Sequence, residues 1–147
     1  MAAALIMPMI IVGLVFVILC VNLGISALLA QVGGWRALSR IYQDPNPSWK
    51  PQFVRQYISV GTVGYNRALN ALVGPDGLHL KMSFTLRFRH LPLLIPWSEI
   101  ASITAKKMLF GSLYDVVLRQ PGTKLGFNGA LGEAILKEWQ EHSPALT

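Results

Sequence analysis

The stretch from Met9 to Ala30, MIIVGLVFVILCVNLGISALLA, contains no charged residue. As an α-helix with about 1.5 Å of rise per residue it would be about 33 Å long, and the hydrocarbon core of a bilayer is about 30 Å thick. No other stretch of the sequence restricts the fold as strongly. We therefore expect residues 1–32 to form a transmembrane helix that anchors the chain.

A cleaved signal peptide is the alternative to an anchor. No Lys or Arg precedes the segment, and its apolar run is longer than the roughly 7–15 residues of a signal peptide's hydrophobic region. The small-x-small cleavage pattern also fails, because Leu28 lies two positions before Ala30 and Ile25 two positions before Ala27. These features favour an anchor that is retained in the mature protein.

The charge of the chain, +6 over 147 residues, is densest just after this segment. Residues 33–55 hold four basic residues and one acidic residue, a net +3, whereas residues 56–147 hold nine and six, also +3. This placement suits an anionic lipid surface, and no run of Lys and Arg with interleaved aromatics indicates nucleic-acid binding. By the positive-inside rule, the N-terminus is expected outside and the remainder in the cytoplasm.

Small residues recur along one side of the predicted helix at spacings of three and four: Gly13, Val17, Cys20, Gly24 and Ala27. Such a stripe lets a second membrane helix approach closely. Asn22 and Ser26 form a polar pair one turn apart, and a polar side chain in hydrocarbon needs a partner. Two interpretations stay open: a helix packed against other membrane helices, or a lone anchor whose Ser26 bonds its own backbone and whose Asn22 lies near the interface.

Residues 33–54 are predicted to connect the anchor to a domain. Gly33 and Gly34 end the helix, and residues 36–42 form a short interfacial helix with Leu38, Ile41 and Tyr42 on one side. Three prolines between positions 45 and 51 favour an extended spacer. The residues expected at the lipid headgroups are Trp35, Arg36 and Arg40.

Residues 55–147 are expected to form one small cytoplasmic domain of α+β class. Alternating apolar and polar residues predict six to seven short antiparallel strands, including 57–63, 68–73, 78–84, 86–89, 91–96 and 100–105. A hairpin of 113–118 and 124–127 surrounds the turn Gln120–Thr123. The last segment is an amphipathic helix capped by Asn128 or Gly129, with Leu131, Ala134, Ile135 and Trp139 buried and Pro144 beyond its end.

Two runs in this domain, Gly77-Leu78-His79-Leu80 and Leu93-Leu94-Ile95-Pro96-Trp97-Ser98-Glu99-Ile100, resemble the "GL-x-L … IPW-x-EI" pattern of bacterial membrane proteins with pleckstrin-homology-like or GRAM-like domains. The resemblance covers roughly residues 55–142 and implies a small β-barrel or sandwich closed by a C-terminal helix, with the IPW segment beginning a strand. Eukaryotic relatives bind phosphoinositides through basic residues near the first hairpin. This chain departs from that pattern, because residues 57–73 hold only Arg67 as a basic residue.

Residues for catalysis are not assembled in the sequence. His79, His90 and His142 fall in different elements, His79 is expected to face solvent, and the single cysteine excludes an internal disulfide or a Cys/His zinc set. We expect no catalytic residues, no cofactor, no metal and no small-molecule substrate. The aromatic residues expected to fill the core are Phe84, Phe88, Trp97, Phe110, Tyr114, Phe127 and Trp139, with Phe110 the one that is either buried or exposed for contact.

Basic residues cluster in two places, Arg87 and Arg89 beside His90, and Lys106 and Lys107 before the apolar Met108–Phe110. With Phe110 they are candidate contacts for lipid or a partner, or a solvated rim. We expect an accessory subunit of a larger bacterial inner-membrane complex, respiratory or photosynthetic, whose partners are integral membrane subunits. The alternative is an autonomous module that senses anionic headgroups or a cytoplasmic protein.

Overall fold

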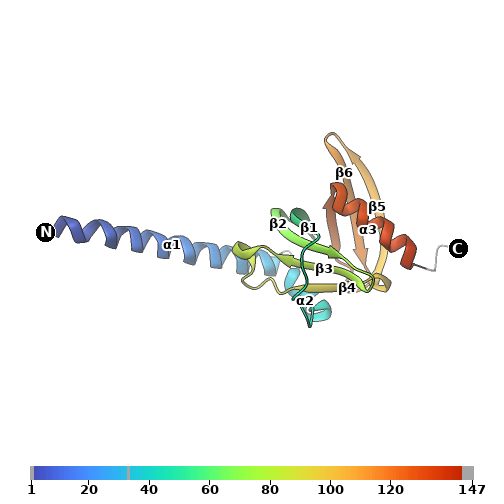
Figure 1. Ribbon diagram of the computed structural model, residues 1–147, viewed down its shortest axis with the longest axis horizontal. Helices are drawn as coiled ribbons and strands as arrows, with labels where there is room; N and C mark the ends of the chain where they lie inside the picture. Colours follow the sequence, from blue (N-terminus) through green and yellow to red (C-terminus); the bar gives the residue numbers. More distant parts are fainter. Residues whose placement is uncertain (1, 33, 144–147) are drawn as a thin grey trace.

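The computed structural model describes residues 2–32 and 34–143. A long helix extends away from a compact domain (Figure 1). The helices are α1 (Ala2–Val32), α2 (Trp35–Tyr42) and α3 (Gly129–His142), with 3₁₀ turns η1 (Phe84–Leu86) and η2 (Trp97–Glu99). The strands are β1 (Phe53–Val60), β2 (Val63–Val73), β3 (Gly77–Met82), β4 (Leu93–Pro96), β5 (Ile100–Met108), β6 (Gly111–Leu118) and β7 (Lys124–Asn128).

Helix α1 contains 31 residues and is therefore about 46 Å long. Its stretch Ala4–Leu28 has a mean hydropathy of 3.1 and is long and apolar enough to cross a membrane. The helix begins at Ala2, so Pro8 lies inside it. The backbone hydrogen bond that Pro8 cannot donate is a loss that apolar helices of this kind tolerate. The predicted stop at Gly33 and the position of Pro144 lie outside the described residues.

The seven strands form one antiparallel sheet in the order β4-β3-β2-β1-β7-β6-β5. Strands β4 and β5 lie at opposite edges, yet only the three residues of η2 join them. The distance from Pro96 to Ile100 can therefore be at most about 14 Å, so the sheet has to curl until its edges meet at this corner. Helix α3 packs against β6 and β7 and completes an α+β half-barrel, as expected from the sequence.

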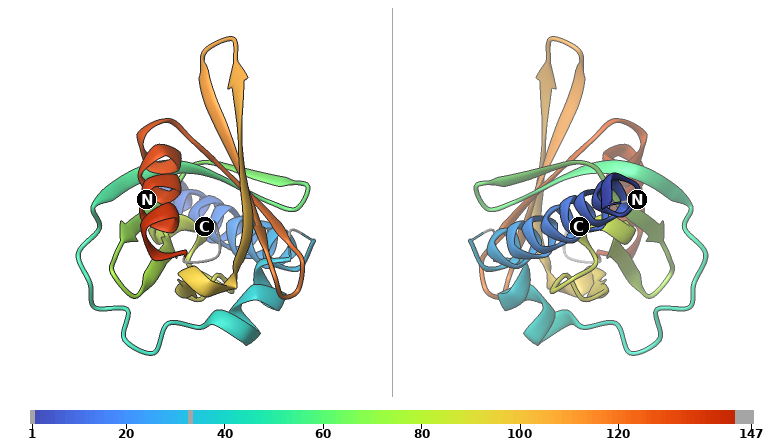
Figure 2. Two further views of the ribbon diagram at one scale, coloured as in Figure 1. Left: turned by 90° about the vertical axis from the view of Figure 1, so that its right-hand side faces the viewer. Right: turned by 90° about the vertical axis from the view of Figure 1, so that its left-hand side faces the viewer.

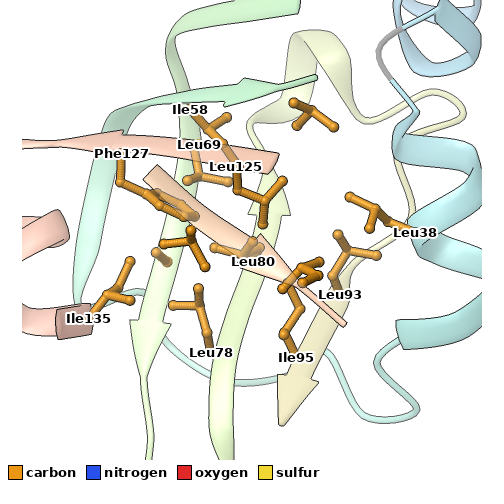
Figure 3. Close-up of a cluster of buried hydrophobic side chains, with 14 of the residues drawn as sticks. Leu38, Ile58, Leu69, Leu78, Leu80, Leu93, Ile95, Leu125, Phe127 and Ile135 are labelled. Atoms are coloured by element: carbon orange, nitrogen blue, oxygen red, sulfur yellow. The ribbon is translucent and has the colours of Figure 1, made fainter. Parts of the chain in front are cut away.

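The core of the half-barrel draws on every part of the domain (Figure 3). Ile58, Leu80 and Phe127 from the sheet and Ile135 from α3 are fully buried, together with Leu38 of α2. The segment predicted to lie at the headgroups thus contributes to the core. The expectation that the Trp35 indole lies among lipid headgroups is wrong, because Trp35 is fully buried in the domain. Ile41, which was expected to share one side of this helix with Leu38 and Tyr42, is exposed whereas these two are buried.

The proline-rich segment after α2 has no regular structure, as predicted, but it is fastened to the sheet. The Asp44 N–H donates to the Pro92 carbonyl at 2.9 Å, and the Gln52 N–H donates to the Ala71 carbonyl at 2.9 Å. We call residues 43–52 the strap, because both of its ends are bonded to the domain.

The residues that carry the sequence resemblance build the corner between the two sheet edges. Gly77 pairs with Pro96 and Leu80 with Leu93, so the two runs are neighbouring strands. A Cβ on Gly77 would collide with the Ile95 carbonyl, so only glycine fits this approach. The Trp97 indole N–H donates to the Gly74 carbonyl at 3.0 Å. Ile95 and Pro96 end β4 rather than begin a strand, because the chain turns at Trp97–Glu99.

Two strand predictions were wrong. Residues 57–63 are not one strand, because Gly61 and Thr62 form the turn between β1 and β2, where Gly61 has a φ of 58°. Residues 86–89 alternate apolar and basic side chains but form a turn after η1, and Arg89 has a left-handed φ of 63°. Leu86 packs on the core, whereas Arg87, Phe88 and Arg89 are exposed.

Candidate membrane and partner interface

Ser26, near the end of α1, joins the long helix to the domain. It is fully buried, and its hydroxyl lies 2.7 Å from the Phe88 carbonyl and 3.2 Å from His90 Nδ1. Neither interpretation of the polar pair foresaw this contact, since Ser26 bonds a loop of its own chain that is 62 residues away. Asn22 bonds its own helix, because its amide N–H donates to the Ile18 carbonyl at 2.8 Å. The lone-anchor interpretation had expected such a backbone bond of Ser26 and not of Asn22.

His90 continues this junction into the sheet. It is fully buried, and Nε2 lies 3.0 Å from the Tyr65 hydroxyl. Burial lowers the pKa of His90 and raises the pKa of Tyr65 to about 12, so the ring is neutral and the phenol keeps its proton near neutral pH. Tyr65 therefore donates to Nε2, and the ring N–H on Nδ1 points toward the Phe88 carbonyl at 3.2 Å.

Trp35 closes the junction from α2. Its indole N–H donates to the Leu91 carbonyl at 3.0 Å, and its ring centre lies 5.4 Å from that of His90. Helices α1 and α2 and strand β2 thus meet on the segment between β3 and β4. This polar cluster, Ser26, His90 and Tyr65, has all its side-chain hydrogen bonds within the chain, so it holds α1 in a fixed direction relative to the domain.

The loop of residues 84–90 presents two aromatic side chains beside α1. Phe84 is 85% exposed and Phe88 is 46% exposed, so the expectation that both lie in the core is wrong. With Leu19, Asn22 and Leu23 they line a groove of about 380 Å³ between the loop and the helix. Arg87 and Arg89 are exposed on the same loop, and neither forms an ion pair within residues 2–32 and 34–143.

The hairpin of β5 and β6 ends in a second apolar surface. Its tip residues Met108, Leu109 and Phe110 are 60%, 89% and 96% exposed, which answers the question left open for Phe110 and excludes it from the core. Figure 2 shows that this hairpin projects sideways from the axis of α1. We call residues 108–110 the hairpin tip.

The two predicted basic clusters belong to separate surfaces. Arg87 and Arg89 lie on the loop beside α1, whereas Lys106 and Lys107 lie on edge strand β5. The ammonium group of Lys106 lies 2.7 Å from the Asp115 carboxylate, which Lys124 also approaches at 3.7 Å. Asp115 therefore compensates at most one of the two positive charges of this second cluster, and it is shared with Lys124.

His79 was predicted to face solvent, and this prediction is wrong. It is almost fully buried, with Nδ1 3.3 Å from the Asp44 carboxylate and Nε2 3.0 Å from that of Asp76. Burial alone would raise the pKa of Asp44, but hydrogen bonds from the Asn46 N–H, the Trp49 indole and His79 outweigh it and lower that pKa. These contacts fasten the strap. The sequence gives no local signal for them, because Asp44 and His79 are 35 residues apart.

The two buried polar clusters, around His90 and around His79, hold parts of the fold together. The pair Ser26 and His90 has the residue types of a nucleophile and a base, but Ser26 is fully buried and no substrate atom can reach its hydroxyl. Both ring nitrogens of His79 are engaged with carboxylates. Among the residues that the structure describes, no group of three or more His, Cys, Asp and Glu is arranged to hold a metal ion.

The stripe of small residues on α1 remains accessible. A Cβ on Gly13 or Gly24 would meet no atom within 4 Å. At about 100° per residue, the stripe lies roughly 130° around the helix from the face formed by Leu19, Asn22, Leu23 and Ser26. Docking of the domain therefore leaves Gly13, Val17, Cys20 and Gly24 exposed, and Ala27 is half-buried. Trp97, Phe127 and Trp139 are buried as predicted, and Tyr114 is half-buried.

Comparison of the chain with protein-family models, with curated proteins and with solved structures finds no match.

Proposed function

We propose that this chain is a non-catalytic, single-pass accessory subunit of a larger bacterial inner-membrane assembly, with its half-barrel in the cytoplasm. The observation that carries the proposal is the exposed hairpin tip on a domain that is fixed to its membrane helix. Exposed apolar clusters of this kind mark contact sites. The hairpin projects sideways from α1 (Figure 2), and we expect its tip to contact a neighbouring protein in the same membrane.

A second contact for such a neighbour is the stripe of small residues on α1. A partner subunit would therefore pack one of its membrane helices against the stripe and contact the hairpin tip with a cytoplasmic surface. The curled antiparallel sheet with its C-terminal helix also supports the pleckstrin-homology-like assignment, a fold that hosts many non-catalytic roles.

Purification in mild detergent tests this proposal. We expect the tagged full-length chain to bring down integral membrane proteins in stoichiometric amounts. Leu109→Asp with Phe110→Asp, and separately Gly24→Leu, should reduce their recovery several-fold. Val54→Asp is the control, because it places one aspartate, against two in the tip variant, at an exposed apolar position on another strand. Recovery of the chain alone in every detergent tried would contradict the proposal.

An autonomous module that reads anionic headgroups is the second candidate. The specific observation in its favour is that Arg87 and Arg89 lie exposed beside α1 without ion pairs among the described residues. The same purification separates the two candidates. A chain that is recovered without protein partners but retains anionic phospholipid supports the module and not the subunit.

A further inference from the structure

We propose that the loop of residues 84–90 is inserted into the leaflet that α1 enters on the domain side, with Phe84 and Phe88 among the acyl chains and Arg87 and Arg89 at the lipid phosphates. This inference rests on the proposed placement of α1 in the membrane, and it adds a second membrane contact. Its ligand is an anionic phospholipid, held by both its acyl chains and its headgroup.

The depth of the loop follows from the residues of α1 that it faces. Phe84 and Phe88 share a groove with Leu19 and Leu23, which precede Leu28, the end of the apolar stretch, by nine and five residues. These positions lie about 14 Å and 8 Å inside that end along the helix axis. The groove therefore opens beside a part of the helix that lies within the apolar span.

The apolar stretch of α1 is longer than the hydrocarbon core is thick, so the depth of the groove depends on how the helix is positioned along the membrane normal. The 25 residues of Ala4–Leu28 are about 37 Å long, which exceeds a 30 Å hydrocarbon core by about 7 Å. If all of this excess lay on the domain side, Leu23 would lie at the edge of the hydrocarbon and Leu19 about 6 Å within it. Even in that limit, the inner part of the groove faces acyl chains rather than water.

The loop cannot swing away from this position without breaking its junction with α1. Ser26 bonds the carbonyl of Phe88 at 2.7 Å, and His90 bonds Tyr65 at 3.0 Å on the other side of the loop. The apolar side chain of Phe84, which is 85% exposed, is therefore held beside the part of α1 that lies within the apolar span. Because the loop is held in place by these hydrogen bonds, its contact with lipid does not require a conformational change.

Charge identifies the occupant as lipid. The Arg89 guanidinium lies 5.7 Å from the centre of the Phe88 ring, and Arg87 lines a hollow of about 350 Å³ that Lys81 also borders. Guanidinium groups next to exposed aromatic side chains suit a phospholipid, whose phosphate lies at the surface of the layer formed by its acyl chains. An uncharged partner helix in the groove would leave these cations without a counter-charge.

Spin labelling of the full-length chain tests the depth. In a Cys20→Ser background, nitroxides are attached to Leu19→Cys, Phe84→Cys, Phe88→Cys and Leu109→Cys, and the protein is placed in nanodiscs of phosphatidylcholine and phosphatidylglycerol. Accessibility to oxygen, which concentrates in hydrocarbon, is compared with accessibility to a water-soluble nickel chelate. We expect the oxygen-to-nickel ratio at 84 and 88 to approach that at 19 and to exceed that at 109 several-fold.

Three other results would overturn the proposal, and each has a separate meaning. Nickel access at 84 equal to that at 109, with 19 still in lipid, rejects insertion of the loop but leaves the placement of α1 intact. A label at 84 shielded from both probes shows that a protein fills the groove. Nickel access at 19 shows that α1 does not span the bilayer, and the proposed function then fails with this inference. Because Phe84 is exposed, its replacement leaves the core unchanged.

Discussion

Single buried polar side chains decide how this molecule holds together. His90 is fully buried, accepts a hydrogen bond from Tyr65 and contacts Ser26. A neutral ring suits this site, because it offers one donor and one acceptor in the right places. A second proton would remove the acceptor that Tyr65 uses and would place a charge inside the domain.

The first prediction concerns the pH dependence of stability. Burial lowers the pKa of His90 below its ordinary 6.5, so below that pH the unfolded chain binds a proton that the folded chain does not. The free energy of unfolding should therefore fall as pH decreases from 6.5 toward the folded pKa, by up to about 1.4 kcal/mol per pH unit. Urea unfolding in detergent, followed by tryptophan fluorescence at pH 7.5, 6 and 5, measures this.

His90→Asn is the comparison for this prediction, since asparagine hydrogen-bonds but does not titrate. We expect the variant to be less stable at pH 7.5 but to lose less stability on acidification than the wild type. The lowered pKa of Asp44 acts in a separate window, below its ordinary 3.8, and does not interfere. Equal slopes for the two chains would show that His90 is not the titrating group.

At the scale of elements, the strap shows how an irregular segment becomes part of a domain. The Asp44 carboxylate is buried and accepts from the Asn46 N–H at 2.9 Å and from the Trp49 indole at 2.8 Å. Lys81 adds a hydrogen bond to the Trp49 carbonyl at 3.2 Å and lies 4.3 Å from the centre of its ring. One carboxylate therefore determines the path of about seven residues.

The second prediction is that Asp44→Ala releases the strap. The substitution leaves the indole and amide donors without their acceptor, which should cost about 1–3 kcal/mol of unfolding free energy. Limited proteolysis should then cut within residues 45–51 before the rest of the domain. Asp76→Ala is the matched control: Asp76 also contacts His79, but its carboxylate is 59% exposed, so the effect should be smaller. Equal cutting of both variants would contradict the assigned role of Asp44.

Elements with a strong local pattern were predictable from the sequence. Helix α1 follows from its long uncharged apolar run, α3 from apolar periodicity, and the β6–β7 hairpin from the Pro-Gly turn at its centre. The site was not predictable in the same way, because Ser26 and His90 are 64 residues apart and neither carries a signal for the other. Arg87 and Arg89 were singled out by sequence, but Phe84 and Phe88 were assigned to the core, because only the fold shows which apolar residues lie beside α1.

At the scale of the whole molecule, side-chain contacts set the angle between α1 and the half-barrel. In the proposed placement of α1 across a membrane, the positions of the hairpin tip and of the loop relative to the bilayer both depend on this angle. Ser26 supplies the polar contacts of the junction, and removal of its hydroxyl would leave the Phe88 carbonyl and His90 without this partner inside a buried site. The orientation of the domain should therefore depend on a single hydroxyl.

The third prediction is that Ser26→Ala broadens the distribution of distances between α1 and the domain. Nitroxides at Leu14→Cys and Lys137→Cys, in a Cys20→Ser background, report this distance by pulsed electron resonance in nanodiscs. Asn22→Ala is the control, because the Asn22 side chain lines the groove but hydrogen-bonds its own helix and, among the described residues, not the loop, so the distribution should stay narrow. Ser26→Leu, which overfills the junction, should shift the mean as well. Narrow distributions in both Ser26 variants would mean that packing between α1 and α2 alone orients the helix, and the hydroxyl would then not be what fixes the depth of the loop.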